Sequence, residues 1–257
     1  MNQRCITSVC ATVLQALGID LPIGIDAPNE ALNEKADRVI LYNPDAVAWW
    51  LYEKYPQIFE SAKSHSQFDL KMRSVMPSVT PVCFASMYTG LVPQEHGIQR
   101  YEKPVLQVDT MFDYLLKAGK KVAIVSTAGD SISKIFLERK MDYYIYPTKF
   151  QVNRKAMQLI REDRYDVLVI YNPDYDSMMH ALGPERKRTL LHLSQNVKTY
   201  TQIVKLIEKH YADKKVLYGF CPDHGCHHID GGRGSHGLDV DEDMNVIHFY
   251  GYNRPTV

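Results

Sequence analysis

The stretch KVLYGFCPDHG, residues Lys215–Gly225, contains the features that decide the fold. It begins as a nearly continuous apolar run, which is typical of a strand buried on both faces of a sheet, and it ends in a Pro-Asp-His turn. Four other runs share the apolar character: RVILY (Arg38–Tyr42), KVAIVS (Lys121–Ser126), DVLVIY (Asp166–Tyr171) and NVIHFY (Asn245–Tyr250). We therefore predict a buried, mostly parallel central sheet that contains these five strands.

Helical patterns separate the apolar runs. The candidates cover Asp109–Ala118, Val152–Asp163 and about Glu185–His210. In the last of these, apolar residues recur every three or four positions, so one face of the helix would pack on the sheet. The alternation predicts an α/β fold with a doubly wound sheet and helices on both faces. We expect residues 1–257 to form a single domain without linkers or repeats.

The composition is that of a compact soluble protein without a bias in charge. The 257 residues are 45% hydrophobic, which is enough to fill a core, and 30 basic residues balance 30 acidic ones. This balance gives no electrostatic footprint for a nucleic-acid polymer or an anionic membrane, so we expect neither partner. Charged substrates would be recognised locally.

The N-terminal stretch CITSVCATVLQALGI, Cys5–Ile19, could be taken for a signal sequence. It is too short to span a bilayer and is interrupted by polar residues. Its apolar positions instead fit an amphipathic helix that ends at Gly18. The chain has five cysteines, an odd number in mostly apolar contexts, which argues against a disulfide framework. We therefore predict a cytoplasmic location.

Three of the apolar runs end in an aspartate. LYNPD ends at Asp45, IYNPDYD ends at Asp176 and GFCPD ends at Asp223. Open α/β sheets bind ligands at the carboxyl ends of their strands, so these side chains would meet at one edge. Three carboxylates would repel one another there, and a bound cation would remove the repulsion.

Histidines accompany these aspartates. His180 lies four residues after Asp176 on the same face of a helical turn, His224 follows Asp223 directly, and His236 returns from a glycine-rich loop. Three carboxylates and three imidazoles suit zinc or a similar first-row ion. Six ligands are more than one catalytic ion needs, so we predict two divalent metal ions, zinc first and manganese second. Asp174 is a neighbour that could replace Asp176, but it has no histidine four residues on.

Other residues in the same segments allow alternative interpretations. A structural zinc site could use four neighbouring side chains, although they lack the usual paired Cys-x-x-Cys and His-x-x-x-His spacing: Cys221, Cys226, His227 and His228. Trp49 and Trp50 could stack on a nucleobase, but two tryptophans at a helix start are more often core or interface anchors.

A second informative segment is MPSVTPVCFASMYTGLVPQEHGI, Met76–Ile98. Pro81 is favoured at the first position of a helix, and Gly90 can stop one, so Thr80 would sit at a helix N-terminus. Free amides and the helix dipole favour a phosphoryl group at such a position, and a metal ion would favour the threonine alkoxide. The alternative is that Thr80 only caps the helix.

These motifs resemble the alkaline phosphatase superfamily, in its branch of type I phosphodiesterases and nucleotide pyrophosphatases, with phosphonoacetate hydrolase close by. The resemblance extends over most of the chain from Asp45 onward. Each motif alone is weak, but five in the family's order are specific. They are the nucleophilic Thr80, Thr89-Gly90 with PQEHGI (Pro93–Ile98), DSMMHALGP (Asp176–Pro184), Asp223-His224-Gly225 and His236-Gly237.

The resemblance implies a two-metal hydrolase of small phosphate esters. In-line attack of Thr80 on phosphorus would give a phosphothreonine intermediate, which water then hydrolyses, and the reaction would be of the phosphodiesterase or nucleotide pyrophosphatase type. One metal would be held by Asp176, His180 and His236, and the other by Asp45, Asp223, His224 and Thr80.

The sequence departs from the family at two positions. Ala46 follows Asp45 where the family usually has glycine, and Cys83 stands where diesterases place an asparagine for a phosphoryl oxygen. The same machinery could therefore act on a phosphomonoester or a phosphonate. A sulfatase is disfavoured because its Cys-x-Pro-x-Arg site is missing around Thr80, and a non-catalytic metal-binding protein is the alternative from another class.

The insertions that build a cap over the site in larger members are absent from the sequence. The predicted helix fills nearly all of the chain between Pro184 and the next strand. We therefore expect a minimal cap, with a site that is either open or completed by a second subunit in a homo-oligomer.

Overall fold

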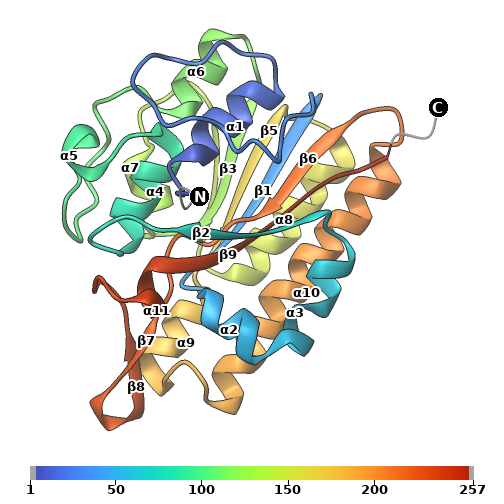
Figure 1. The fold of residues 1–257 in the computed structure, drawn as a ribbon. Coiled ribbons are helices and arrows are strands. Elements are labelled where there is room, and N and C mark those ends of the chain that lie inside the picture. Colours follow the sequence, from blue (N-terminus) through green and yellow to red (C-terminus); the bar gives the residue numbers. More distant parts are fainter. Residues whose placement is uncertain (1–3, 255–257) are drawn as a thin grey trace.

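The computed structural model describes residues 4–254 and is built around a seven-stranded sheet (Figure 1). The strand order is β2-β9-β6-β1-β5-β3-β4. The bounds of these strands are β1 Arg38–Pro44, β2 Phe68–Arg73, β3 Val122–Thr127, β4 Asp142–Tyr146, β5 Val167–Asn172, β6 Val216–Phe220 and β9 Asn245–Tyr252. All five predicted strands are present, as β1, β3, β5, β6 and β9.

The sheet is mostly parallel, as predicted. β1 pairs in parallel with both β5 and β6, and β3 pairs in parallel with β5 and β4. β9 pairs antiparallel with both β6 and β2. The two strands that the sequence did not reveal, β2 and β4, lie at the edges of the sheet. Their residues are only partly buried, so they lack the continuous apolar run of a central strand.

Helices cover both faces of the sheet, which confirms the doubly wound prediction (Figure 1). One face carries α1 Ser8–Ala16, α4 Thr80–Thr89, α6 Met111–Lys117 and α7 Ile132–Ile135. The other carries α2 Trp49–Lys54, α3 Pro56–Ser64, α8 Lys149–Glu162, α9 Asp174–Leu182 and α10 Lys187–His210. Every helix among residues 4–254 is too short or too polar to span a bilayer.

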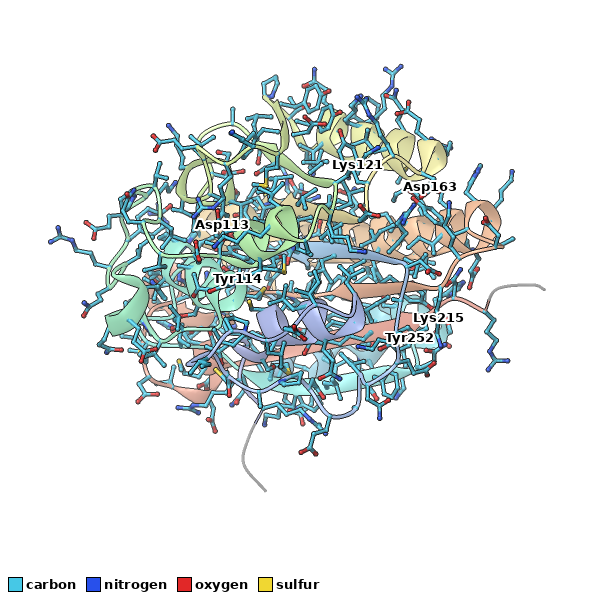
Figure 2. The ribbon with its side chains drawn as sticks, turned by 90° about the horizontal axis from the view of Figure 1, so that it is seen from above. Asp113, Tyr114, Lys121, Asp163, Lys215 and Tyr252 are labelled. Atoms are coloured by element: carbon cyan, nitrogen blue, oxygen red, sulfur yellow. The ribbon has the colours of Figure 1, made fainter. Side chains whose placement is uncertain are left out.

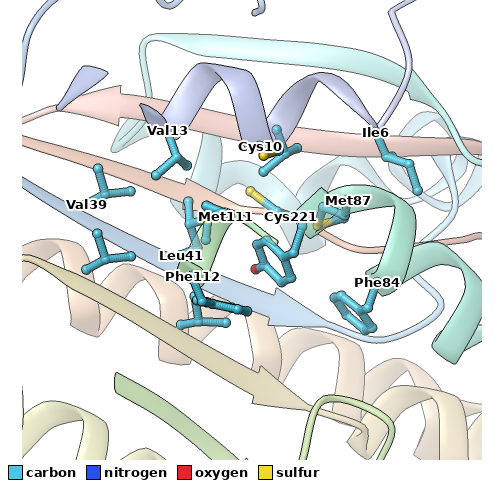
Figure 3. Packing of buried hydrophobic residues seen from close by; sticks show 14 of the residues in the cluster. Ile6, Cys10, Val13, Val39, Leu41, Phe84, Met87, Met111, Phe112 and Cys221 are labelled. Carbon is cyan, nitrogen blue, oxygen red and sulfur yellow. The ribbon is translucent and has the colours of Figure 1, made fainter. Parts of the chain in front are cut away.

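The first face buries a compact apolar cluster (Figure 3). Cys10 and Val13 of α1 lie over Val39 and Leu41 of β1, and Phe112 of α6 packs into the same layer. α1 is buried on nearly all sides rather than along one stripe. The predicted helix is therefore present, but it does not have the exposed polar face of an amphipathic helix. Its polar residues are accommodated because they bond within the chain: Thr12 Oγ1 donates to Ser8 O at 2.7 Å.

The helices predicted from periodicity are α6, α8 and α10. α8 begins at Lys149, earlier than predicted, because Thr148 caps it by accepting a hydrogen bond from the Gln151 amide. All five cysteines are free, in line with the expected absence of a disulfide framework. α10 ends at His210 and β6 begins at Val216, so no cap is inserted between them.

Charged residues at the amino ends of the parallel strands form a closed network. Arg38 Nε and Nη1 lie 2.9 and 2.8 Å from carboxylate oxygens of Asp163 and Asp166. Lys214 contacts the second oxygen of Asp163, and the Lys121 amide donates to Asp166 at 2.7 Å. Figure 2 labels Lys121 and Asp163 of this group. Every aspartate named here has a donor for both carboxylate oxygens.

The β7–β8 hairpin and α11 lie below the carboxyl edge of the sheet in Figure 1, whereas α5 lies to the left of α4 and α7. β7 His227–Ile229 and β8 Arg233–Ser235 form a two-stranded hairpin around the short helix η1 Asp230–Gly232. α11 Asp241–Met244 follows the hairpin and leads into β9, and α5 Pro93–His96 follows α4.

Candidate active site

The three predicted aspartates meet because their strands are neighbours in the sheet. β1 lies between β6 and β5, and each strand delivers its aspartate just beyond its carboxyl end. Asp45 follows β1 directly, Asp176 lies in the first turn of α9, and Asp223 follows β6. Ala46 has a φ of 63°, the left-handed region that glycine favours, which explains why glycine would be the usual residue there.

Asp176, His180 and His236 form a first cluster. His180 Nε2 lies 3.2 Å from Asp176 Oδ1 and 3.1 Å from His236 Nε2. His236 Nε2 lies 3.5 Å from the same aspartate oxygen. Three ligand atoms therefore point at one small volume, and the group has the size and composition of a metal site.

Asp45, Asp223 and His224 form a second and more deeply buried cluster. His224 Nε2 lies 3.3 Å from Asp45 Oδ1 and 3.4 Å from Asp223 Oδ2. Thr80 joins them from another element, with Oγ1 3.3 Å from His224 Nε2 and 3.4 Å from Asp45 Oδ2. Within residues 4–254, these two clusters are the only groups of three or more side chains that could hold a metal ion.

The three histidines all turn Nε2 toward the clusters and Nδ1 toward the backbone. Nδ1 of each ring lies at hydrogen-bond distance from a backbone carbonyl: Gly234 O for His180 at 3.1 Å, Ser78 O for His236 at 3.0 Å and Gly225 O for His224 at 2.9 Å. A carbonyl only accepts, so Nδ1 donates and the lone pair of Nε2 is left for a ligand. The rings of His224 and His236 stack with centroids 3.9 Å apart and thus hold the clusters side by side.

One oxygen of each aspartate has no hydrogen-bond partner. Asp45 Oδ1, Asp176 Oδ1 and Asp223 Oδ2 are buried and unpaired, although each faces an imidazole nitrogen. Buried carboxylate oxygens are costly unless a proton or a cation neutralises them. Unpaired oxygens beside Nε2 lone pairs are what a divalent cation requires, so the residues present fit the metals that the sequence predicts.

The electrostatics of the second cluster disfavour every charged form. Burial, reinforced by Asp176, raises the pKa of Asp45 to about 7. Burial and the charge of Asp45 raise the pKa of Asp223 well above its usual value, and burial and His236 lower the pKa of His224. A bound cation would reverse these shifts, because it stabilises carboxylates and neutral imidazole together.

In the first cluster, by contrast, the aspartate and the two histidines stabilise one another's charged forms. Burial acts to raise the pKa of Asp176, but the adjacent imidazoles of His180 and His236 stabilise the carboxylate when they are protonated, and this outweighs burial and lowers the pKa. The pKa of His180 is raised because the Asp176 carboxylate beside Nε2 stabilises the protonated imidazole. The pKa of His236 is also raised, since its interactions with Asp176 outweigh its burial. Protons would therefore compete with a metal ion for this cluster.

Thr80 does not act as a capping side chain. The helix α4 is capped by Val79, the side chain of Thr80 is only 5% exposed, and its hydroxyl faces Asp45 and His224. Pro81 has no amide hydrogen, and the amides of Val82 and Cys83 bond to Val79 O. The helix start thus offers its dipole rather than a row of free amides.

The alternative zinc site is not formed. Cys221 lies in the apolar core, Cys226 packs beside Tyr175, His227 contacts Asp243 and His228 contacts Glu185. Cys221 and Cys226 belong to different core clusters, and within residues 4–254 the four side chains do not form a group that could hold a metal ion.

The other candidates also have local partners. Asp174 contacts Lys149 and His192, which separates it from Asp176. Trp50 donates from Nε1 to Cys226 O at 2.8 Å and thus anchors the segment after His224. Cys83 is fully buried, with Sγ 3.2 Å from Ser74 Oγ, and burial raises its thiol pKa well above the usual value. A neutral, buried thiol is poorly reactive, so Cys83 is not a candidate nucleophile.

Two residues near the clusters were not identified from the sequence. Tyr171, the last aromatic residue of β5, donates from its hydroxyl to Asp45 Oδ2. Asp130, in the turn after β3, has a buried Oδ2 without a hydrogen-bond partner, and burial raises its pKa to about 7. Asp130 also follows the end of a predicted strand, so the pattern that selected Asp45 and Asp223 could have selected it.

Comparison with known proteins agrees with this arrangement. The family model described as Type I phosphodiesterase / nucleotide pyrophosphatase matches residues 39–247, which include every residue of both clusters and Thr80. The chain therefore belongs to the type I phosphodiesterase/nucleotide pyrophosphatase family. A comparison with curated proteins gives no match.

Solved structures of similar fold come from the same class of proteins. Human ectonucleotide pyrophosphatase/phosphodiesterase 5 superposes with a TM-score of 0.65 at 13% identity, over 83% of this chain and 87% of that one. The murine protein of the same name, an inactive variant in complex with AMP, gives 0.60 at 14% identity, over 76% of this chain and 59% of that one. A second murine structure gives 0.59, and this chain covers 58% of it. At these identities the likeness establishes the fold.

Family membership defines the general activity. The protein is a phosphoric ester hydrolase of a metal-dependent family that acts on small phosphorylated substrates. The fold is the mixed α/β fold of its relatives, with a mostly parallel central sheet.

Proposed function

We propose that this protein is a two-metal phosphodiesterase or nucleotide pyrophosphatase that uses Thr80 as its nucleophile. The observation that carries the proposal is the convergence of Thr80 Oγ1 with two adjacent ligand clusters, each containing a buried carboxylate oxygen without a partner. A lone metal site or a lone threonine would not distinguish a catalyst from a metal-binding protein. The combination is what a hydrolase with a covalent intermediate requires.

The chain's own residues divide the work. Asp176, His180 and His236 would hold one ion, and Asp45, Asp223, His224 and Thr80 would hold the other. Divalent ions bound there, zinc or manganese, would supply the positive charge that stabilises negatively charged phosphoryl oxygens. Thr80 Oγ1 lies 3.3 Å from His224 Nε2 and 3.4 Å from Asp45 Oδ2, so the hydroxyl lies beside the ion that these two residues would hold.

The reaction would proceed in two displacements. Thr80 Oγ attacks phosphorus as its proton is lost, the ester bond to the leaving group breaks, and the leaving oxygen takes up a proton. A water molecule then attacks the phosphothreonine, the bond between Oγ and phosphorus breaks, and Thr80 regains its proton. The dipole of α4 favours the negative charge at both stages.

A test compares three substrates with zinc or manganese supplied: an aryl phosphate diester, the monoester and a phosphonate. We expect the diester to be turned over fastest and Thr80→Ala to lose roughly 10³-fold or more in kcat. Thr12→Ala, which removes a buried hydroxyl of α1 far from the clusters in sequence and element, serves as the control and should retain activity. Equal rates for Thr80→Ala and wild type would refute the nucleophile.

One observation supports a second substrate class on the same site. Cys83 is turned toward Ser74 and is buried as a neutral thiol, so it supplies no amide to a phosphoryl oxygen. Turnover of the monoester or phosphonate above the diester would favour this alternative. No metal-dependent turnover of any of the three would favour a non-catalytic metal-binding protein.

The cytoplasmic location, the single-domain organisation and the homo-oligomer stay predictions. The prediction of a homo-oligomer is tested by measuring the mass in solution and by following activity as the protein is diluted. A monomer that is fully active would contradict a site completed by a second subunit.

A further inference from the structure

Asp243 of α11 is a fully buried carboxylate that makes two side-chain contacts. Oδ1 accepts a hydrogen bond from His227 Nδ1 at 2.7 Å, and Oδ2 accepts one from the Leu238 amide at 2.9 Å. Its backbone carbonyl accepts a third, from the Gly225 amide at 2.7 Å. One residue of a four-residue helix is thus bonded to three separate points of the segment that precedes it.

These three points flank two of the proposed metal ligands. Gly225 follows His224 directly, and Leu238 lies two residues after His236. His227 lies between them, opposite Ser235 in the β7–β8 hairpin. Figure 1 shows α11 beside the start of this hairpin. The contacts of Asp243 therefore close the base of the loop that carries His224 to one cluster and His236 to the other.

The packing around Gly225 makes this connection rigid. A Cβ at Gly225 would lie 2.0 Å from the carbonyl oxygen of Glu242, so the backbone of α11 is in close contact with the turn after His224. The Cys226 amide donates to the same carbonyl at 3.0 Å. A shift of α11 would therefore move the turn on which His224 depends.

We propose that Asp243 is a positioning residue that sets the placement of His224 relative to His236, and thereby the spacing between the two metal sites. The inference rests on the proposed function. A metal site tolerates only small displacements of its ligands, and loss of the residues that orient ligands commonly weakens metal affinity about 10–100-fold. The stacked rings of His224 and His236, with centroids 3.9 Å apart, have no direct bond that fixes their spacing, whereas the carboxylate of Asp243 bonds to both segments.

The test uses Asp243→Asn, which keeps the shape of the side chain but gives up the charge and one acceptor. We expect zinc affinity, measured by competition with a chelator, to fall about tenfold or more for both sites. We expect kcat to fall while KM changes less than threefold. In the metal-free variant, hydrogen exchange should accelerate at the Gly225 and Leu238 amides.

Two control variants separate positioning from stability. Glu242→Gln removes a charge from an exposed neighbour in the same helix. Asp113→Asn removes a carboxylate that accepts from the Thr110 amide and Arg139 Nε, both at 2.8 Å, on another helix (Figure 2). Both variants should bind zinc as the wild type does, even where Asp113→Asn lowers the melting temperature.

Variants of His227 keep the test decisive if Asp243→Asn does not fold. His227→Gln can still donate to Asp243 and should retain more zinc affinity than His227→Ala. Wild-type zinc affinity and kcat in Asp243→Asn, or in His227→Ala, would overturn the inference. Absence of zinc binding by the wild type would overturn the proposed function itself, and this outcome is distinguishable because it requires no variant.

Discussion

Aspartates gather at both edges of the central sheet, and the two groups differ in what surrounds them. At the amino edge, Asp163 and Asp166 face Arg38, Lys214 and the Lys121 amide. At the carboxyl edge, three aspartates face one another and three imidazole nitrogens, with one oxygen of each unpaired. The number of acidic residues is similar, so it does not mark the functional site. What marks it, within residues 4–254, is that buried carboxylate oxygens of Asp45, Asp176 and Asp223 have no hydrogen-bond partner.

The two groups also differ in the sign of their effect on stability. Contacts with Arg38 and Lys214 hold the pKa of Asp163 below its usual value despite partial burial, so its charged form favours folding. Burial raises the pKa of Asp45 to about 7, so its charged form opposes folding until a cation arrives. The carboxyl edge is thus arranged for a ligand at the expense of the metal-free protein.

The largest expected effect is on catalytic activity, which a substitution at the carboxyl edge should reduce and one at the amino edge should not. Asp223→Asn should lower metal-dependent phosphodiester hydrolysis roughly 10³-fold, because it removes a shared carboxylate of the buried cluster. Asp166→Asn, at the amino edge, should leave kcat/KM within about twofold. Steady-state kinetics at saturating zinc measure both, and a comparable loss in the two variants would remove the functional distinction between the edges.

Metal addition should stabilise only a protein with an intact carboxyl edge. Zinc at 100 times its dissociation constant should raise the free energy of unfolding by about 2.7 kcal/mol for each site occupied. Urea titrations with and without zinc should show this increase in wild type and Asp163→Asn, and a smaller one in Asp223→Asn. An equal increase in all three proteins would place the metal outside the proposed clusters.

Without metal, substitutions at the two edges should change stability in opposite directions. Asp45→Asn at pH 8 removes one charge from a buried acidic cluster and should raise the free energy of unfolding by about 1–2 kcal/mol. Asp163→Asn should lower it by about 1 kcal/mol, since Arg38 and Lys214 lose a shared partner. Urea unfolding in the presence of a chelator measures both, and destabilisation by Asp45→Asn would contradict the comparison.

The smallest effect is a pH dependence at the amino edge. Because the pKa of Asp163 is lowered in the folded state, its contribution is present above its unfolded pKa of about 4 and is lost as the pH falls through the folded value. The stability difference of about 1 kcal/mol between wild type and Asp163→Asn should therefore shrink below pH 4, and it is no larger because these side chains are partly exposed. A stability difference that grows as the pH falls below 4 would show that the charged form of Asp163 does not favour folding.

Much of this architecture was accessible from the sequence because central strands and ligand motifs have local signatures. Five apolar runs identified β1, β3, β5, β6 and β9, and the position of an aspartate after three of them identified the edge of the sheet that carries the clusters. The edge strands β2 and β4 were missed because partly exposed strands lack such a run. α2, α3 and α9 were not delimited because short helices have too few turns for a clear period.

The contacts of the site could not be obtained in this way. Asp243 and Leu238 are near in sequence, but nothing in the sequence indicates that the carboxylate also reaches His227 and orders the turn after His224. Tyr171 is an ordinary strand residue in the sequence, and its contact with Asp45 depends on the pairing of β5 with β1.

By itself, the sequence determined which residues are candidates for binding metal and at which edge of the sheet they gather, because buried strands and motifs are recognisable in short stretches of the chain. Only the tertiary structure decided that each of the three histidines turns Nε2 toward its cluster, that one oxygen of each aspartate is left unpaired, and that Cys221, Cys226, His227 and His228 have other contacts. The physical reason is that a buried polar atom finds its partner by packing in three dimensions, and the partners come from strands and turns that are remote along the chain.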